Sequence, residues 1–152
     1  MSRRSVIKKR YPQPDSNYNS CLVSLLTARI LKSGKKSLAD SIILETFALI
    51  QEKTDSDPLQ VFEKAIQNIT PLVEVKARRI GGSTYQVPLE VSRYRGTNLA
   101  LRWLIAAAKA RAGRTISIKL ASFMLPGDPR LKASGFRKAE TATSTADKPT
   151  KL

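Results

Sequence analysis

Apolar residues recur every three or four positions along most of this chain, which is the spacing of one face of an α-helix. Leu22, Leu26 and Ile30 show this spacing first, and Ile116 and Leu120 show it last. The pattern predicts helices over about 20–32, 38–53, 58–70, 98–112 and 116–125.

Residues at the predicted helix ends support these limits. Asp57 can accept a backbone N–H, and Pro58 suits the first helical position. Gly34 is expected to end the first helix, and Pro71 the third. We expect the other N-caps at Ser37, at Thr97 or Asn98, and at Thr115.

Between residues 73 and 90 the period changes to two. Val73 and Val75 alternate with charged residues, and a second alternating run follows Gly81-Gly82. This arrangement predicts a β-hairpin. Because a two-stranded hairpin with neither face buried is not stable by itself, this one needs the helical body or a ligand. The predicted fold class is therefore mainly α, a bundle of five to six helices with one protruding β-hairpin, or ribbon.

Composition divides the chain into three parts. Residues 1–17 are basic and lack an apolar period, and we expect them to form an N-terminal arm. Residues 18–138 are the expected helical domain, with the hairpin at about 73–90. Residues 139–152 are rich in Thr and Ala, and we expect a flexible C-terminal tail.

The chain is strongly basic, with 27 Lys and Arg against 12 Asp and Glu, a net charge of +15. Six of the 12 acidic residues lie between 40 and 63, whereas residues 91–127 contain seven basic residues and no acid. A fold with one acidic and one basic side indicates a polyanion binder. Charge alone leaves RNA, DNA and an anionic membrane open, although no apolar run is long enough to span a bilayer.

The predicted ribbon carries the most specific candidates for nucleic-acid contact. Lys76, Arg78 and Arg79 lie on its first strand, where they could pair with phosphates. On its second strand Tyr85 could stack on a base, and Gln86 could hydrogen-bond a base edge. The alternative is an ordinary hairpin packed on the helices, with Tyr85 in the core.

A second basic cluster begins after the ribbon and comprises Arg93, Arg95, Arg102, Lys109, Arg111 and Arg114. Arg102 and Lys109 are seven residues apart and so share a helix face, and Arg95, ahead of the predicted helix, is expected near the same surface. Charges that offset a helix dipole are the alternative, chiefly for Arg111 and Arg114. Lys35 and Lys36 fit a phosphate contact and a solvated turn equally well.

Catalysis and metal binding find little support. The chain has no histidine and one cysteine, which excludes imidazole chemistry, a zinc cluster and an internal disulfide. We expect Cys21 to be a small buried hydrophobe and Trp103, on an apolar stripe, to be a core residue. Gly81-Gly82 lacks the spaced glycines of a nucleotide loop. No cofactor and no enzymatic activity are expected.

Two longer strings of residues resemble a known family. Residues 74–88, EVKARRIGGSTYQVP, and residues 99–103, LALRW, are similar to the signature of small-subunit ribosomal protein seven, the universal head-domain family. Shorter matches at residues 2–4, 34–37, 57–59 and 62–65 extend the likeness over most of residues 1–125. Residues 135–141 are similar to the start of the family's basic sixth helix, but the chain then departs from the family, which leaves that helix open here.

The resemblance implies a structural constituent of the small ribosomal subunit that binds its rRNA directly and nucleates assembly of the 3′ major (head) domain. It implies a ribbon near the exit-site tRNA and the mRNA path, and contact with the neighbouring platform protein, number eleven. The RNA-contacting residues that it implies are Arg3, Arg4, Lys8, Lys9, Arg10, Lys35, Lys36, Lys76, Arg78, Arg79, Arg95, Arg102, Lys109, Arg111 and Arg114.

The wording of residues 29–32 and 113–114 is similar to plastid members of that family. The N-terminal residues are not expected to form a leader. Together with the similarity to plastid members, this favours a chloroplast stromal protein, with the bacterial cytoplasm as the alternative.

The main competing hypothesis is an architectural DNA-binding protein with a β-ribbon arm. Such proteins are commonly shorter dimers with paired arms. A single hairpin in a larger helical body instead favours a monomer held in a particle over a homo-oligomer. An RNA-modifying enzyme, the third hypothesis, would need a cofactor loop and catalytic acids that the sequence lacks.

Overall fold

The computed structural model describes residues 12–125. Its elements in order are α1 (Cys21–Ile30), α2 (Lys36–Thr54), α3 (Pro58–Ile69), β1 (Val73–Ile80), β2 (Ser83–Glu90), α4 (Arg93–Lys109) and α5 (Ile116–Met124). The predicted mainly helical fold with one hairpin is confirmed. Residues 1–11 of the expected arm, the C-terminal tail and any sixth helix lie outside the described residues.

One core is shared by all five described helices. Phe47 on α2 and Phe62 on α3 are fully enclosed, and their ring centroids lie 5.8 Å apart. Leu104 of α4 and Leu120 of α5 belong to the same cluster. Burying each such side chain contributes about 1.5–3 kcal/mol. Trp103 packs against the cluster and is partly buried, which agrees with its expected core position.

Tyr18 closes this core from the segment before α1. Its ring meets Phe47 edge-on, with centroids 4.9 Å apart. Burial, and then the nearby carboxylates of Asp15 and Asp57, raise the pKa of the Tyr18 hydroxyl. The phenol is therefore neutral at physiological pH, as a side chain packed on the core requires.

Two predicted caps are confirmed. The Asp57 carboxylate accepts the N–H of Leu59 at 3.1 Å, with Pro58 as the first residue of α3. The Thr115 hydroxyl accepts the N–H of Ile118 at 3.4 Å at the start of α5. Each satisfies one of the backbone donors that a helix start leaves unpaired.

The other two predicted caps are wrong because both helices begin earlier. Gly34, at φ 73°, turns the chain so that α2 starts at Lys36, and the Ser37 carbonyl accepts the Ser41 hydroxyl inside the helix. Helix α4 starts at Arg93, with Ser92 at the cap position. Thr97 and Asn98 instead donate to carbonyls four residues before them, as side chains in a helix interior do.

Cys21 is exposed, which corrects its expected burial. It stands in the first turn of α1, whose buried residues are Val23, Leu26 and Thr27. Those positions define the side of the helix that faces the core, and Cys21 lies off it.

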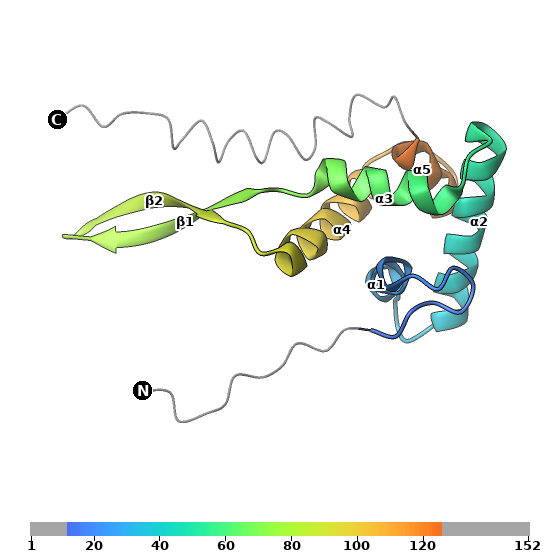
Figure 1. Cartoon of the computed structure of the whole chain (residues 1–152), viewed down its shortest axis with the longest axis horizontal. Coiled ribbons are helices and arrows are strands. Elements are labelled where there is room, and N and C mark those ends of the chain that lie inside the picture. The colour runs from blue at the N-terminus through green and yellow to red at the C-terminus, as the bar shows by residue number, and fades with distance from the viewer. Residues whose placement is uncertain (1–11, 126–152) are drawn as a thin grey trace.

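The hairpin leaves the helical body at one end and projects away from it (Figure 1). Gly81 and Gly82 form its turn, with φ values of 57° and 96°, the two positive angles of the turn type that joins twisted strands. At its root the Val91 N–H donates to the Leu72 carbonyl at 3.0 Å. A Cβ on the buried Gly96 of α4 would lie 2.9 Å from Thr70 Cγ2, so α3 and α4 converge closely at the root.

We expect Phe47→Ala to lower the free energy of unfolding by about 3–5 kcal/mol, because the ring is fully enclosed by helices and leaves a cavity. Urea denaturation followed by circular dichroism measures the change. Leu44→Ala on the same helix, where the side chain is 42% exposed, is the control and should change stability much less. Equal losses would show that Phe47 is not central to the core.

Candidate nucleic-acid interface

The ribbon has two faces, and its register assigns each candidate residue to one of them. Arg78 lies opposite Tyr85, and Lys76 lies opposite Val87. Because facing residues of an antiparallel pair point to the same side, these four share one face. Arg79 and Gln86 fall on the other face, together with Ala77 opposite Gln86. The structure therefore separates Arg78 and Tyr85 from Arg79 and Gln86.

Neither face of the ribbon is buried beyond its root. Lys76, Arg78 and Arg79 are exposed, as is every residue of the turn. Tyr85 is 50% exposed, so the alternative that placed it in the core is wrong. An exposed aromatic ring across from an arginine offers a stacking surface beside a phosphate-binding group, the combination that single-stranded RNA favours.

The start of α4 adds positive charge at the root of the ribbon. Arg93 and Arg95 lie in its first turn, which contains no acidic residue, and the N-terminal end of a helix itself attracts anions. Arg95 is thus inside the helix rather than ahead of it. Its Nε donates to Glu74 Oε2 at 2.7 Å, which ties the helix to strand β1.

The remaining candidates on α4 and beyond differ in their surroundings. Arg102, Lys109 and Arg114 are exposed. Arg111 is half-buried, donates to the Ser122 hydroxyl at 2.8 Å and lies over the Phe123 ring. Its guanidinium thus joins the end of α4 to α5, a structural contact that sequence spacing did not predict.

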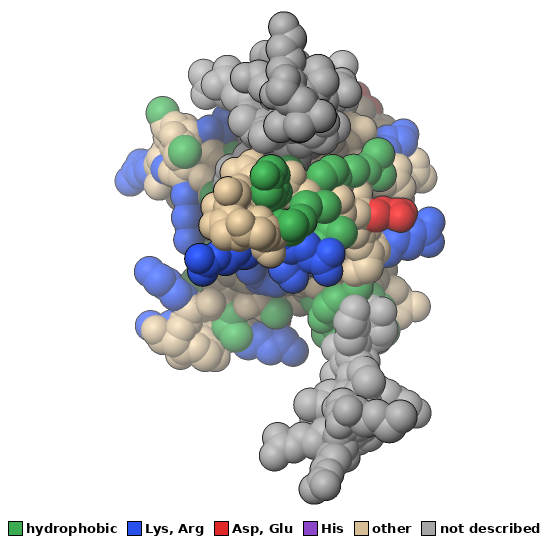
Figure 2. Space-filling view, turned by 90° about the vertical axis from the view of Figure 1, so that its left-hand side faces the viewer, with side chains coloured by type: hydrophobic (Ala, Val, Ile, Leu, Met, Phe, Trp, Pro, Cys, Tyr) green, Lys and Arg blue, Asp and Glu red, His purple; other side chains and the backbone are tan. Residues whose placement is uncertain are grey.

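Seen from the end that carries the ribbon, the molecule shows many Lys and Arg side chains and few Asp and Glu side chains (Figure 2). Acidic residues instead concentrate on α2, α3 and the turn between them. They are Asp40, Glu45, Glu52, Asp55, Asp57 and Glu63. Glu74 and Glu90 lie on the ribbon itself, so the charge expected from the sequence is a bias between elements rather than a clean division into two sides.

Lys35 caps α2 after the turn that follows α1, and Lys36 is the first residue of α2, far along the chain from the ribbon. Lys35 and Lys109 both line a cavity of about 500 Å³ between the ends of α1 and α4 and the starts of α2 and α5. Arg29 and Lys32 line it too, and sequence reasoning missed them. The only signal was a basic residue, Arg29, in the last turn of α1, with Lys32 two residues beyond the helix, and charges there also fit a helix dipole.

Other chemistry finds no support in residues 12–125. No group of three or more His, Cys, Asp or Glu side chains there could hold a metal ion. None of the helices described is both long and apolar enough to cross a membrane. The candidates in the arm, Arg3, Arg4, Lys8, Lys9 and Arg10, lie outside the described residues.

The chain has a helical body, an exposed basic ribbon and an arginine-rich helix start. This combination is typical of structural proteins that bind polyanions. A family model described as ribosomal protein S7p/S5e matches residues 2–147. The chain belongs to this ribosomal protein family, and it is a plastid-like member.

Three relatives illustrate the similarity. Small ribosomal subunit protein uS7c of Trieres chinensis is 65% identical over 122 residues, which cover 80% of this chain and 77% of the relative. The uS7 proteins of Arthrospira platensis and Synechocystis sp. are 52% and 55% identical, each over 93% of this chain and 90% of the relative.

We expect Glu74→Gln to strengthen binding to a single-stranded RNA homopolymer, because it removes a carboxylate and releases Arg95 at the ribbon root. The slope of log affinity against log salt should steepen by up to about 0.7 for one added phosphate contact. Stability should fall by less than about 1 kcal/mol, since the pair is exposed. Glu52→Gln on α2 is the matched control, and an equal gain there would indicate a general charge effect.

Proposed function

We propose that this chain is a structural constituent of the small ribosomal subunit that binds its rRNA directly and nucleates assembly of the head domain. The relatives named above are small ribosomal subunit proteins, which supports the proposal that this chain belongs to the same particle. In this proposal the ribbon reaches toward the exit-site tRNA and the mRNA path. No enzymatic activity is part of it.

The single observation that carries the proposal is the exposed ribbon. Its basic side chains are held away from the body on a two-stranded arm that buries neither face. Such an arm suits a groove or junction in folded RNA, where phosphates approach from both sides. RNA would also supply the packing that the ribbon lacks by itself.

The proposed RNA surface combines three regions: the ribbon, helix α4 with the turn after it, and the start of α2 with the residue before it. It comprises Lys35, Lys36, Lys76, Arg78, Arg79, Tyr85, Gln86, Arg93, Arg95, Arg102, Lys109, Arg111 and Arg114, with the arm residues Arg3, Arg4, Lys8, Lys9 and Arg10. Phosphate contacts position the protein, and only Tyr85 and Gln86 are suited to read bases.

The proposed partners are head-domain rRNA and neighbouring subunit proteins, including platform protein eleven, with tRNA and mRNA close by. Self-association is not proposed, because copies with a charge of +15 repel one another. We propose the chloroplast stroma as the compartment, because 65% identity to a uS7c protein exceeds the identity to the two cyanobacterial relatives above. The bacterial cytoplasm is the alternative.

Charge reversal tests the ribbon. We expect Arg78→Glu with Arg79→Glu to weaken binding to a head-domain rRNA fragment at least tenfold at moderate salt, measured by filter binding. The matched control is Lys148→Glu with Lys151→Glu, which makes the same change of net charge in the C-terminal tail. It should weaken binding to the rRNA fragment less. The opposite order would count against the ribbon.

The DNA-binding alternative predicts a different preference. We expect the rRNA fragment to outcompete duplex DNA of equal length by at least a hundredfold, because A-form junctions and unpaired bases match the ribbon. Equal affinities in this competition would favour the architectural DNA-binding protein. Sedimentation of the native protein apart from small subunits would also contradict the ribosomal assignment.

A further inference from the structure

The outer face of helix α2 lies at the end of the body opposite the ribbon (Figure 1). Asp40, Leu44, Ala48 and Glu52 are spaced four residues apart and so form one stripe along this helix. Phe47 and the other buried residues of α2 face the core, on another side of the helix. At 1.5 Å per residue the stripe spans roughly 18 Å, which is long enough to receive a partner helix.

An apolar side chain stands in the middle of this stripe. Leu44 is 42% exposed, and the small side chain of Ala48 is exposed one turn further along. A ridge of residues four apart packs into the groove of another helix. One exposed leucine is common on a protein surface, so its meaning here depends on the charges around it.

The carboxylates of the stripe have no cationic partner in the part of the chain that the structure describes. The side chains of Asp40 and Glu52 form neither an ion pair nor a hydrogen bond within residues 12–125. Asp55, also exposed, adds a third carboxylate directly after the helix. Unpaired negative charges around an exposed leucine match a surface of the opposite charge with an apolar side chain of its own.

A small cleft adjoins the stripe, between α2 and the segment before α1. Asp15, Tyr18, Asp40 and Leu44 are among its lining residues, and no Lys or Arg is among those described. Its volume of about 10 Å³ suits one group of the size of a water molecule. A lysine ammonium has that size, and the two carboxylates could accept its hydrogen bonds.

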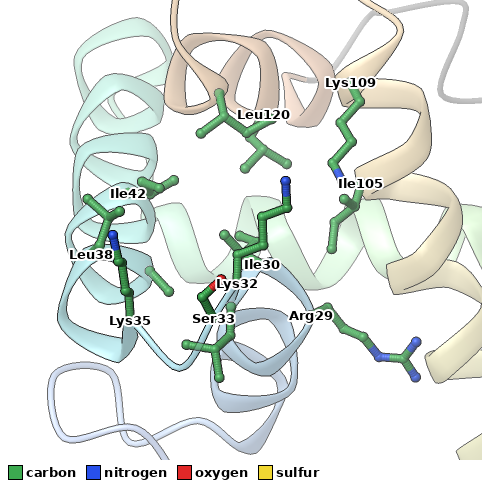
Figure 3. A pocket seen from close by; sticks show the side chains of 13 residues that line it. Arg29, Ile30, Lys32, Ser33, Lys35, Leu38, Ile42, Ile105, Lys109 and Leu120 are labelled. Atoms are coloured by element: carbon green, nitrogen blue, oxygen red, sulfur yellow. The ribbon is translucent and has the colours of Figure 1, made fainter.

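The start of the same helix has the opposite charge. Leu38 lines the large cavity described above, and Figure 3 shows the ammonium groups of Lys32 and Lys109 directed into that cavity. RNA phosphates are therefore attracted to the start of α2 and repelled by the stripe. Binding of RNA at the basic surface leaves the stripe uncovered, so a protein is the better occupant for it.

Two other occupants fit the stripe less well. Residues 1–11 contain five basic residues and no acid, but the proposed function assigns them to rRNA. A second copy of the chain has a charge of +15 and is repelled as a whole. A separate protein with a locally basic helix meets neither objection.

We propose that the outer face of α2 docks a basic amphipathic helix of a partner protein. Apolar side chains of that helix, spaced three and four apart, would cover Leu44, and Lys or Arg beside them would pair with Asp40 and Glu52. One lysine would enter the cleft beside Asp15. The inference goes beyond the proposed function, because none of these residues belongs to the proposed RNA surface.

A synthetic peptide tests the proposal. The full chain is titrated, by fluorescence anisotropy at moderate salt, with a labelled helical 16-residue peptide that carries a Leu stripe flanked by Lys. Because the chain as a whole repels a basic peptide, saturable binding requires a local acidic site. Replacing the Leu residues by Ala, or the Lys residues by Gln, should each weaken binding at least about tenfold. Absence of saturable binding, or binding that ignores the Leu stripe, would overturn the proposal.

Variants of the chain locate the site. Leu44→Lys, and separately Asp40→Asn with Glu52→Gln, should weaken the peptide at least about fivefold and change affinity for the rRNA fragment less than about twofold. The matched control for the first is Leu38→Lys, at a side chain 56% exposed on the same helix. Glu63→Gln with Glu90→Gln makes the same change of net charge as the pair, outside the stripe. Circular dichroism confirms folding of each variant.

Four outcomes would overturn the proposal. Equal weakening by the control variants would show that the peptide binds non-specifically. Weaker rRNA binding by Leu44→Lys would place the stripe in the RNA surface. Tenfold tighter peptide binding after deletion of residues 1–11 would make the chain's own arm the occupant. Self-association of the chain that Leu44→Lys abolishes, measured by sedimentation, would make the occupant a second copy.

The ribbon variants keep this proposal distinct from the proposed function. If charge reversal at Arg78 and Arg79 leaves rRNA binding unchanged, the proposed RNA surface is wrong, whereas the peptide result still decides the role of α2. The full chain with unchanged ribbon residues serves for every peptide titration.

Discussion

The ribbon has no buried face, so its position depends on how its two ends are held. Hydrogen bonds between β1 and β2 set its internal register but cannot fix its direction relative to the helices. That direction is set at the root, where Leu72 and Val91 are joined by a backbone hydrogen bond and Gly96 lies against Thr70. The shared core fixes α3 and α4, and through them it places the basic arm.

Local sequence signals predicted the elements well and their limits less well. Asp57 and Thr115 act as expected because a cap followed by an apolar run leaves little alternative. Thr97 and Asn98 were misleading because a Thr or Asn side chain can also bond a carbonyl one turn earlier inside a helix. Ser37 was misleading because α2 already begins at Lys36. The start of α4 at Arg93 matters most, since it moves two arginines from a loop onto a rigid element.

The sequence predicted those parts of the candidate site whose residues are neighbours in the chain. It did not predict those parts that form only when separate elements pack together. The ribbon residues are contiguous, so alternation placed them on a hairpin, but only the register could show that Arg78 and Arg79 face opposite ways. The contacts of Arg95 with Glu74 and of Arg111 with Ser122 join separate elements. The cavity unites residues from position 29 to position 120, a juxtaposition that exists only after the helices pack.

Because the ribbon is held only at its root, near Gly96, a small change in direction there is amplified at its tip. Each strand has eight residues, so at about 3.3 Å per residue the arm reaches roughly 26 Å from its root. A tilt of about 5° at the root would therefore displace the tip by roughly 2 Å, more than half the length of a hydrogen bond. Gly96, which lets α4 approach Thr70 closely, therefore helps to set the direction in which Arg78 and Tyr85 are presented, although it lies far from both.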